Sequence, residues 1–136
     1  MKQYWLLKSE PYKWSWQQQK SVKSEPWDGV RNYQARNFMK SMKVGDEGFF
    51  YHSNEGKEIV GIIQVVKTHY PDPTDPSGKF VCVDVAAQKD MPKPVTLQKI
   101  KETEALQNMA LLKQARLSVS PVRDTEWMHI LRMGGL

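Results

Sequence analysis

Residues 59–67 read IVGIIQVVK, an almost continuously apolar run in which β-branched side chains predominate. A strand of this composition needs cover on both faces, so it belongs in the centre of a sheet and not at an edge. Residues 47–52 (EGFFYH) precede it, and the polar loop between the two contains a glycine, a pattern that predicts a β-hairpin. We therefore expect a fold built around a sheet with this run in its middle.

The other strands expected from the sequence cover residues 4–8, 80–87 and 116–122. The strand at 80–87 is expected to end before Pro92 and Pro94, because proline has no amide to donate to a β-ladder. Residues 71–79 (PDPTDPSGK) contain three prolines and a glycine, and they predict a turn.

Helix caps and periodic apolar residues indicate helices before and after these strands. The predicted capping residues are Ser15, Asn32 and Asp124, and Thr96 precedes the segment LQKIKE. After Asn32, the apolar residues Ala35, Phe38, Met39 and Met42 recur at helical spacing. Residues 103–115 (TEALQNMALLKQA) also favour a helix. These elements predict an α+β fold, with a curved, mostly antiparallel sheet flanked by helices.

The chain has 136 residues, which is the usual size of one domain, so a single domain over residues 1–136 is expected. Cys82 is the single cysteine, so no internal disulfide is expected, and its place between valines predicts a packing role. No apolar stretch is long enough to span a membrane. We therefore expect an intracellular protein, which is cytoplasmic or, in a eukaryote, nuclear. We also expect a monomer.

Positive charge is concentrated near the start of the chain. The net charge is +5, whereas residues 1–45 carry nine Lys and Arg against three Asp and Glu, a local net charge of +6. A field of this kind favours a polyanionic partner and predicts salt-dependent binding, although ordinary solvated lysines explain it equally well.

Residues 27–36 (WDGVRNYQAR) hold the candidate site. Trp27 and Tyr33 offer stacking faces, Asn32 offers an amide, and Arg31 and Arg36 offer fixed cations. This mixture suits a nucleobase with its flanking phosphates, because rings stack on bases and guanidinium groups neutralise phosphate. Trp27 lies between a proline and an Asp-Gly turn instead of in a periodic stripe, which favours a ligand-stacking role over a core role.

The sequence gives little support to catalysis or metal binding. The three histidines are far apart, and no glycine-rich phosphate loop is present, so no metal, cofactor or catalytic residue is expected. Two alternatives to a nucleic-acid binder stay open. One is an enzyme acting on a nucleic acid or nucleoside with Glu10 or His52 as acid or base, and the other is a binder of a small acidic metabolite.

The segments YWLLKSEP, WDGVRNYQARN, MKVGDEGFFYHSN, GIIQVVKTHYPDPT, VDVAAQ, VTLQKIKE and LLKQARLSVSPV together resemble the EVE domain family nearly end to end. The chain departs from that pattern at PDPTDPSGKFVCVDV, where many relatives carry a longer insertion. The resemblance implies a PUA-like fold, akin to the YTH domains that read methylated adenine in RNA. It also implies a non-catalytic reader of a modified base, notably a modified cytosine in DNA, with a modified RNA base as the alternative.

The resemblance carries a set of pocket residues over by motif. They are Trp27, Asn32, Tyr33, Lys8, Ser9, Glu10, His52, Ser53, Asn54, Arg116 and Ser118. Lys8, Arg31 and Arg36 are the residues expected to neutralise phosphate. One buried methyl group contributes only about 0.8 kcal/mol, so strong discrimination of a methylated base needs a cage of rings or a cavity that the plain base fills badly.

Overall fold

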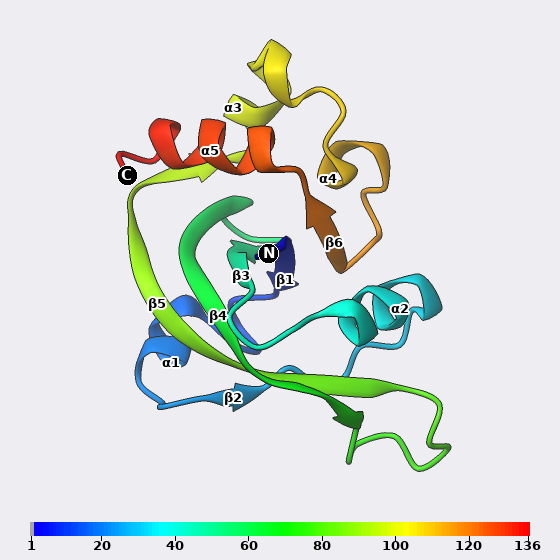
Figure 1. Ribbon diagram of the computed structural model, residues 1–136. Coiled ribbons are helices and arrows are strands. Elements are labelled where there is room, and N and C mark those ends of the chain that lie inside the picture. Colours follow the sequence, from blue (N-terminus) through cyan, green and yellow to red (C-terminus); the bar gives the residue numbers. More distant parts are fainter. Residues whose placement is uncertain (1) are drawn as a thin grey trace.

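The computed structural model describes residues 2–136, which form a curved six-stranded sheet with helices on both faces (Figure 1). The strands are β1 (Tyr4–Ser9), β2 (Glu25–Pro26), β3 (Glu47–His52), β4 (Glu58–Pro71), β5 (Val81–Thr96) and β6 (Val119–Val122). Their order is β2-β5-β4-β3-β1-β6, and β1 with β3 is the parallel pair while the other neighbours are antiparallel. The predicted α+β class, with a curved and mostly antiparallel sheet, is confirmed.

The predicted hairpin is formed by β3 and β4. Glu47 pairs with Gln64, and the pairing continues to His52 opposite Glu58, with one register shift between Phe50 and Tyr51. β4 lies between β3 and β5, so the apolar run from the sequence occupies the interior of the sheet as predicted.

The prediction that the third long strand ends before the prolines is wrong, because β5 continues through Pro92 and Pro94. Its pairing with β4 shifts register between Asp90 and Val95, which lie opposite Gly61 and Ile59. The intervening residues bulge out of the ladder, so the missing proline amides leave no ladder bond unmade. The amide of Lys93 in this bulge donates instead to the Gly134 carbonyl at 3.0 Å.

The helices are α1 (Trp16–Lys20), α2 (Tyr33–Ser41), α3 (Leu97–Glu102), α4 (Ala110–Lys113) and α5 (Asp124–Met133). Two predicted caps are confirmed, since Ser15 and Asn32 each accept a bond from a backbone amide in the first turn, and Thr96 caps α3 in the same way. The third predicted cap, Asp124, is wrong by one residue. Arg123 precedes α5, and its amide donates to the Glu126 carboxylate at 2.9 Å, while Asp124 is already helical.

Residues 103–115 do not form the predicted continuous helix. A 3-10 turn (Glu104–Leu106) and the short α4 take its place, and both Leu106 and Met109 are buried. The Gln107 side-chain amide donates to the carbonyls of Lys101 and Thr103, at 2.8 Å each, and so satisfies the end of α3. Tertiary packing thus overrides a favourable helical propensity.

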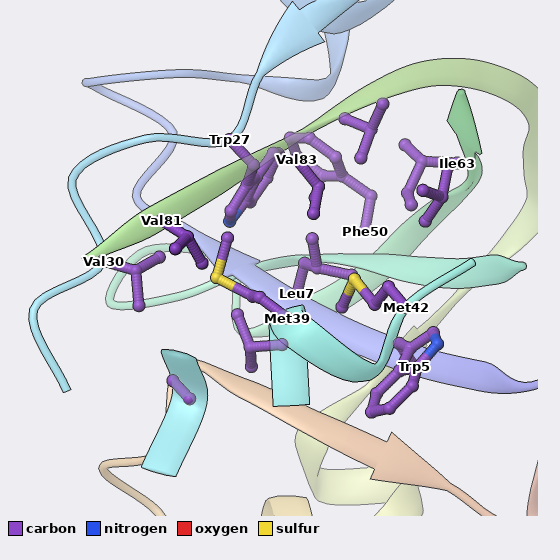
Figure 2. Packing of buried hydrophobic residues seen from close by; sticks show 14 of the residues in the cluster. Trp5, Leu7, Trp27, Val30, Met39, Met42, Phe50, Ile63, Val81 and Val83 are labelled. Atoms are coloured by element: carbon purple, nitrogen blue, oxygen red, sulfur yellow. The ribbon is translucent and has the colours of Figure 1, made fainter. Parts of the chain in front are cut away.

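Both faces of the sheet are buried under helices. Successive side chains of a strand point to opposite faces, so neighbouring residues belong to different cores. Leu7 and Phe50 belong to a core that also receives α1 and α2 (Figure 2), whereas Leu6 and Phe49 belong to a second core with α3 and α5. The first core supports the segment between β2 and α2, which carries the candidate site. Within residues 2–136, no helix combines the length and apolarity needed to cross a bilayer.

Candidate functional site

A cleft of about 490 Å³ opens between the end of β1, the segment from β2 to α2, and the residue before β6. Its walls come from residues 8–10, 13, 14, 25–31 and 118. The volume falls within the range of small-molecule pockets. Six of the predicted residues line this cleft: Lys8, Ser9, Glu10, Trp27, Arg31 and Ser118.

Trp27 belongs to both the core and the cleft. The residue is 7% exposed, and its ring meets the Phe50 ring at a centroid distance of 5.5 Å and an angle of 88°. Figure 2 shows the indole beside Phe50 and Val83, and the Trp27 amide donates to the Val83 carbonyl at 2.7 Å. The ring that borders the cleft therefore has a fixed orientation and presents a small part of its surface to a ligand.

Asp72 fixes the wall of the cleft that follows Trp27. Its carboxylate is buried and accepts bonds from the Gly29 amide at 2.8 Å, the Arg31 guanidinium at 3.1 Å and the Thr74 amide at 2.7 Å. Burial alone raises the pKa of Asp72, but the bonds from Thr74, Gly29 and Arg31 outweigh it and hold the pKa below its ordinary value. Gly29 has a φ of 79°, a conformation that favours glycine.

The end of β1 supplies the opposite wall, as predicted for residues 8–10. The Lys8 ammonium donates to the Ala115 carbonyl at 2.6 Å, and burial lowers its pKa. The Glu10 carboxylate accepts from the Tyr12 hydroxyl, lies 3.3 Å from the Lys13 ammonium and accepts from Asn54. The Tyr12 bond is the main cause that lowers the pKa of Glu10, so this carboxyl is held ionised at the rim.

Two more carboxylates line the cleft, from Glu25 and Asp28. Within residues 2–136, neither takes part in an ion pair. Burial, together with the negative charges of Asp28 and Asp84, raises the pKa of Glu25. A ligand that offers hydrogen-bond donors suits this side of the cleft, because it supplies what the carboxylates lack.

Trp14 is a wall residue of the cleft that also packs against the first core. It is half-buried, and its indole donates to the Gln19 side chain at 2.9 Å. The amides of Lys13 and Trp14 both donate to the Glu10 carbonyl at 2.9 Å, so the chain folds back against the end of β1. Pro11 after Glu10 favours this turn, and the turn brings the Trp14 ring into the lining of the cleft together with Lys8.

Six predicted pocket residues lie outside the lining of the cleft: Asn32, Tyr33, His52, Ser53, Asn54 and Arg116. The Asn32 oxygen is occupied by the Ala35 amide at 2.9 Å. The His52 Nε2 accepts from the Trp16 amide at 3.0 Å, and burial lowers the pKa of His52. These contacts support neighbouring backbone.

Tyr33 and Arg36 also lie outside the lining, on the first turn of α2. Tyr33 is 53% exposed and stacks on Phe80, with ring centroids 5.0 Å apart at 27°. The Arg36 guanidinium carbon lies 4.8 Å from the Tyr33 ring centroid, and the Arg31 guanidinium carbon lies 5.5 Å from that of Phe80. Arg31 therefore joins the cleft to an aromatic and cationic surface beside it.

The sequence model of the EVE domain matches residues 3–133 of this chain. Mouse thymocyte nuclear protein 1 is 38% identical over 164 aligned positions, which cover 96% of this chain and 73% of the mouse protein. The alignment is longer than this chain, so the mouse protein carries residues that have no counterpart here.

Solved structures match as closely. A crystallised protein from Agrobacterium tumefaciens has 52% identity and a TM-score of 0.95, with 98% of this chain and 94% of that chain covered. Human THYN1 protein, crystallised in complex with 5-methylcytosine-containing DNA, has 35% identity and a TM-score of 0.93, with 98% of each chain covered. The PUA-like architecture expected from the sequence is confirmed by these matches.

Proposed function

The chain belongs to the EVE domain family, and from that premise we propose that its cleft binds a modified cytosine base in DNA and catalyses no reaction on it. The observation that carries the proposal is the cleft itself, where two indoles and two carboxylates without ion pairs within residues 2–136 line one space of about 490 Å³. The human relative that binds 5-methylcytosine-containing DNA shares the fold over 98% of the chain.

Stacking is the first contribution to binding. A base that leaves a DNA duplex loses stacking and pairing energy of a few kcal/mol, and one aromatic wall returns about 1 to 3 kcal/mol. Trp27 alone offers little exposed surface, so the half-buried Trp14 in the same cleft supplies a second ring. Two rings account for an extruded base better than the one ring expected from the sequence.

Hydrogen bonding is the second contribution. Cytosine carries an exocyclic amino group, and carboxylates are the side chains that accept from it. Glu25 and Asp28 line the cleft and supply such acceptors. Thymine presents a carbonyl at the same place and would face these charges unfavourably. The acidic side of the cleft thus favours a cytosine derivative.

Discrimination of the added group is the third contribution and the weakest per contact. A methyl group that moves from water into an apolar environment gains about 0.8 kcal/mol, or roughly a fourfold preference. Val30 and the indoles offer apolar contacts in the cleft. A larger preference requires that the plain base leave a gap between the rings, which is a packing penalty and not a hydrogen bond.

The test is a titration of short oligonucleotides that are identical except for one base: cytosine, 5-methylcytosine, 5-hydroxymethylcytosine or thymine, in DNA and in RNA. We expect the modified cytosines in DNA to bind more tightly than cytosine, and Trp27→Phe to reduce that ratio. Glu25→Gln is expected to reduce the preference for cytosine derivatives over thymine, with Glu55→Gln as the control at an exposed loop position. Equal affinity for every base would overturn the proposal, and tighter binding of the RNA set would reassign the substrate to RNA.

Catalysis by Glu10 and His52 is not supported by the contacts of these residues. The His52 Nε2 lone pair is occupied by the Trp16 amide, and His52 does not line the cleft that contains Glu10. A general base needs reach to the substrate proton, directly or through one water. We expect the mass of a modified oligonucleotide to be unchanged after incubation with the protein. A new product that forms with wild type and not with Glu10→Gln would contradict this expectation.

A further inference from the structure

Four side chains beside the cleft form a continuous stack, which we term the ladder and define as Arg31, Phe80, Tyr33 and Arg36. Arg31 lies over Phe80, Phe80 stacks on Tyr33, and Arg36 lies over Tyr33. Cation–π contacts hold a guanidinium in place over a ring. Because Arg31 also lines the cleft, the ladder begins at the cleft and leads away from it onto α2.

Hydrogen bonds fix the two guanidinium groups further. Arg36 donates to the Lys79 carbonyl at 3.1 Å and to the Asn37 side chain at 3.0 Å. Arg31 donates to Asp72 at 3.1 Å and to the Thr74 hydroxyl at 2.9 Å. Each guanidinium has five N–H donors, so both retain capacity for a further acceptor. Two cations held in place this way lose less entropy on binding an anion than solvated lysines would.

The charge around the ladder is positive. The charged side chains that belong to the ladder, are bonded to it or lie one helical turn from it are Arg31, Arg36, Lys40, Lys79, Asp72 and Asp75. Asp28 lines the cleft at the Arg31 end of the ladder. Asp75 is occupied by the amides of Ser77, Lys79 and Phe80. Lys40 follows Arg36 by one turn of α2 and is exposed. Four cations against two engaged carboxylates and Asp28 leave a positive excess, which favours an extended anion.

Tyr33 supplies the remaining group that such an anion needs. It is 53% exposed although one of its ring faces packs on Phe80, and its hydroxyl is a hydrogen-bond donor. A tyrosine hydroxyl and guanidinium groups are the donors that contact phosphate oxygens in protein–DNA complexes.

We propose that the ladder is a preformed seat for the sugar–phosphate backbone next to the base in the cleft, an inference that rests on the proposed function and extends it from the base to its strand. Arg36 and the Tyr33 hydroxyl bind one backbone phosphate, and the Phe80–Tyr33 stack positions Arg36 for that contact. Tyr33 is then a backbone contact and not a wall of the base pocket. Binding through the ladder is independent of base identity, because phosphate carries no sequence information.

The experiment is a titration of the same oligonucleotide with cytosine or 5-methylcytosine, over a series of salt concentrations, with the full chain. Arg36→Gln is expected to weaken binding of both oligonucleotides by the same factor, about tenfold or more, and to reduce the slope of log affinity against log salt by roughly 0.7 to 0.9. Tyr33→Leu is expected to act in the same direction, while Tyr33→Phe keeps the ring under Arg36 and loses only the hydroxyl. Lys101→Gln on α3 removes an equal charge at an exposed position and is the matched control.

The outcomes separate this inference from the proposed function. If wild type prefers the modified oligonucleotide and Arg36→Gln behaves like Lys101→Gln, the ladder inference is wrong and the base-reading proposal stands. If wild type shows no preference but Arg36→Gln weakens both complexes and lowers the salt slope, the ladder binds backbone and the base-reading proposal fails. Urea unfolding of Tyr33→Leu shows whether this variant is folded. Tyr33→Phe keeps the ring stack, so a loss of affinity in this variant measures the hydroxyl contact alone.

Discussion

Replacing Asp72 with alanine is predicted to lower the free energy of unfolding by about 3 kcal/mol, as hydrogen bonds to a charged group contribute about 1.5 to 3 kcal/mol each. Asp72 is 2% exposed as a residue, and its carboxylate accepts from the amides of Gly29 at 2.8 Å and Thr74 at 2.7 Å. We take about 1.5 kcal/mol, the low end of this range, for each of the two bonds, because Gly29 and Thr74 are exposed and their amides can bond to water once the carboxylate is removed. The Arg31 ion pair adds less than about 1 kcal/mol because the Arg31 side chain is 40% exposed.

The effect of Asp72 is also predicted to depend on pH. The pKa of Asp72 is lowered from 3.8 in the folded protein. A carboxyl with a lower pKa in the folded state stabilises fully above its unfolded pKa, and the stabilisation is lost as pH falls through the folded pKa. The difference between wild type and Asp72→Ala is therefore largest at neutral pH and shrinks below about pH 4.

Urea unfolding of wild type, Asp72→Ala and Asp72→Asn at neutral and at acidic pH measures both effects. Asp72→Asn keeps one acceptor oxygen and is expected to lie between the other two. Glu55→Ala removes an exposed carboxylate and is expected to change the unfolding free energy by less than about 0.5 kcal/mol. A loss below about 1 kcal/mol in Asp72→Ala, or a loss that is the same at every pH, would refute the role assigned to this carboxylate.

Three further predictions concern the sheet, the cleft and pH. Gly61→Ala is expected to destabilise by about 1 to 3 kcal/mol in urea unfolding, because its Cβ would lie 2.1 Å from Cζ2 of Trp16, and to destabilise less when Trp16→Phe is also present. Trp27→Ala is expected to lose about 3 to 5 kcal/mol in urea unfolding and to lose the preference for 5-methylcytosine over cytosine, whereas an unchanged preference would exclude Trp27 from the cleft's function. Burial lowers the pKa of His52, so thermal stability should fall as pH drops through that pKa, and this fall should vanish in His52→Gln.

Caps and apolar runs in the sequence predicted the helices and strands whose structure depends on residues close together in the chain. Asn32 caps α2 through its own first turn, and the apolar run in β4 lies where a strand buried on both faces must lie. Pro92 and Pro94 led to a wrong strand end, because a missing proline amide destabilises a strand only where the partner strand needs that hydrogen bond. The bulge opposite Ile59 and Gly61 takes both prolines out of the ladder. Pairing register is a property of two strands, and one strand's sequence does not carry it.

The residues that line the cleft agree with the predicted pocket residues in part. Residues 8–10, which the family resemblance implied, and Trp27, which its place in a loop indicated, line the cleft. Asp72 reaches Gly29 across 43 residues, and turn chemistry already explained its presence in the sequence. Tyr33 lies in the predicted motif, but it stacks on Phe80 and does not line the cleft. Its direction depends on where α2 begins and on where Phe80 lies before β5, and the motif itself contains neither.

A crystal structure of the protein with a short DNA that contains one 5-methylcytosine tests the central claim most directly. The account predicts the modified base out of the DNA stack and in the cleft, with a ring face against Trp27 or Trp14. Its amino group is predicted to lie within about 3.2 Å of a Glu25 or Asp28 oxygen. DNA bound with every base stacked, or with the base in a site that Trp27 does not line, would contradict it.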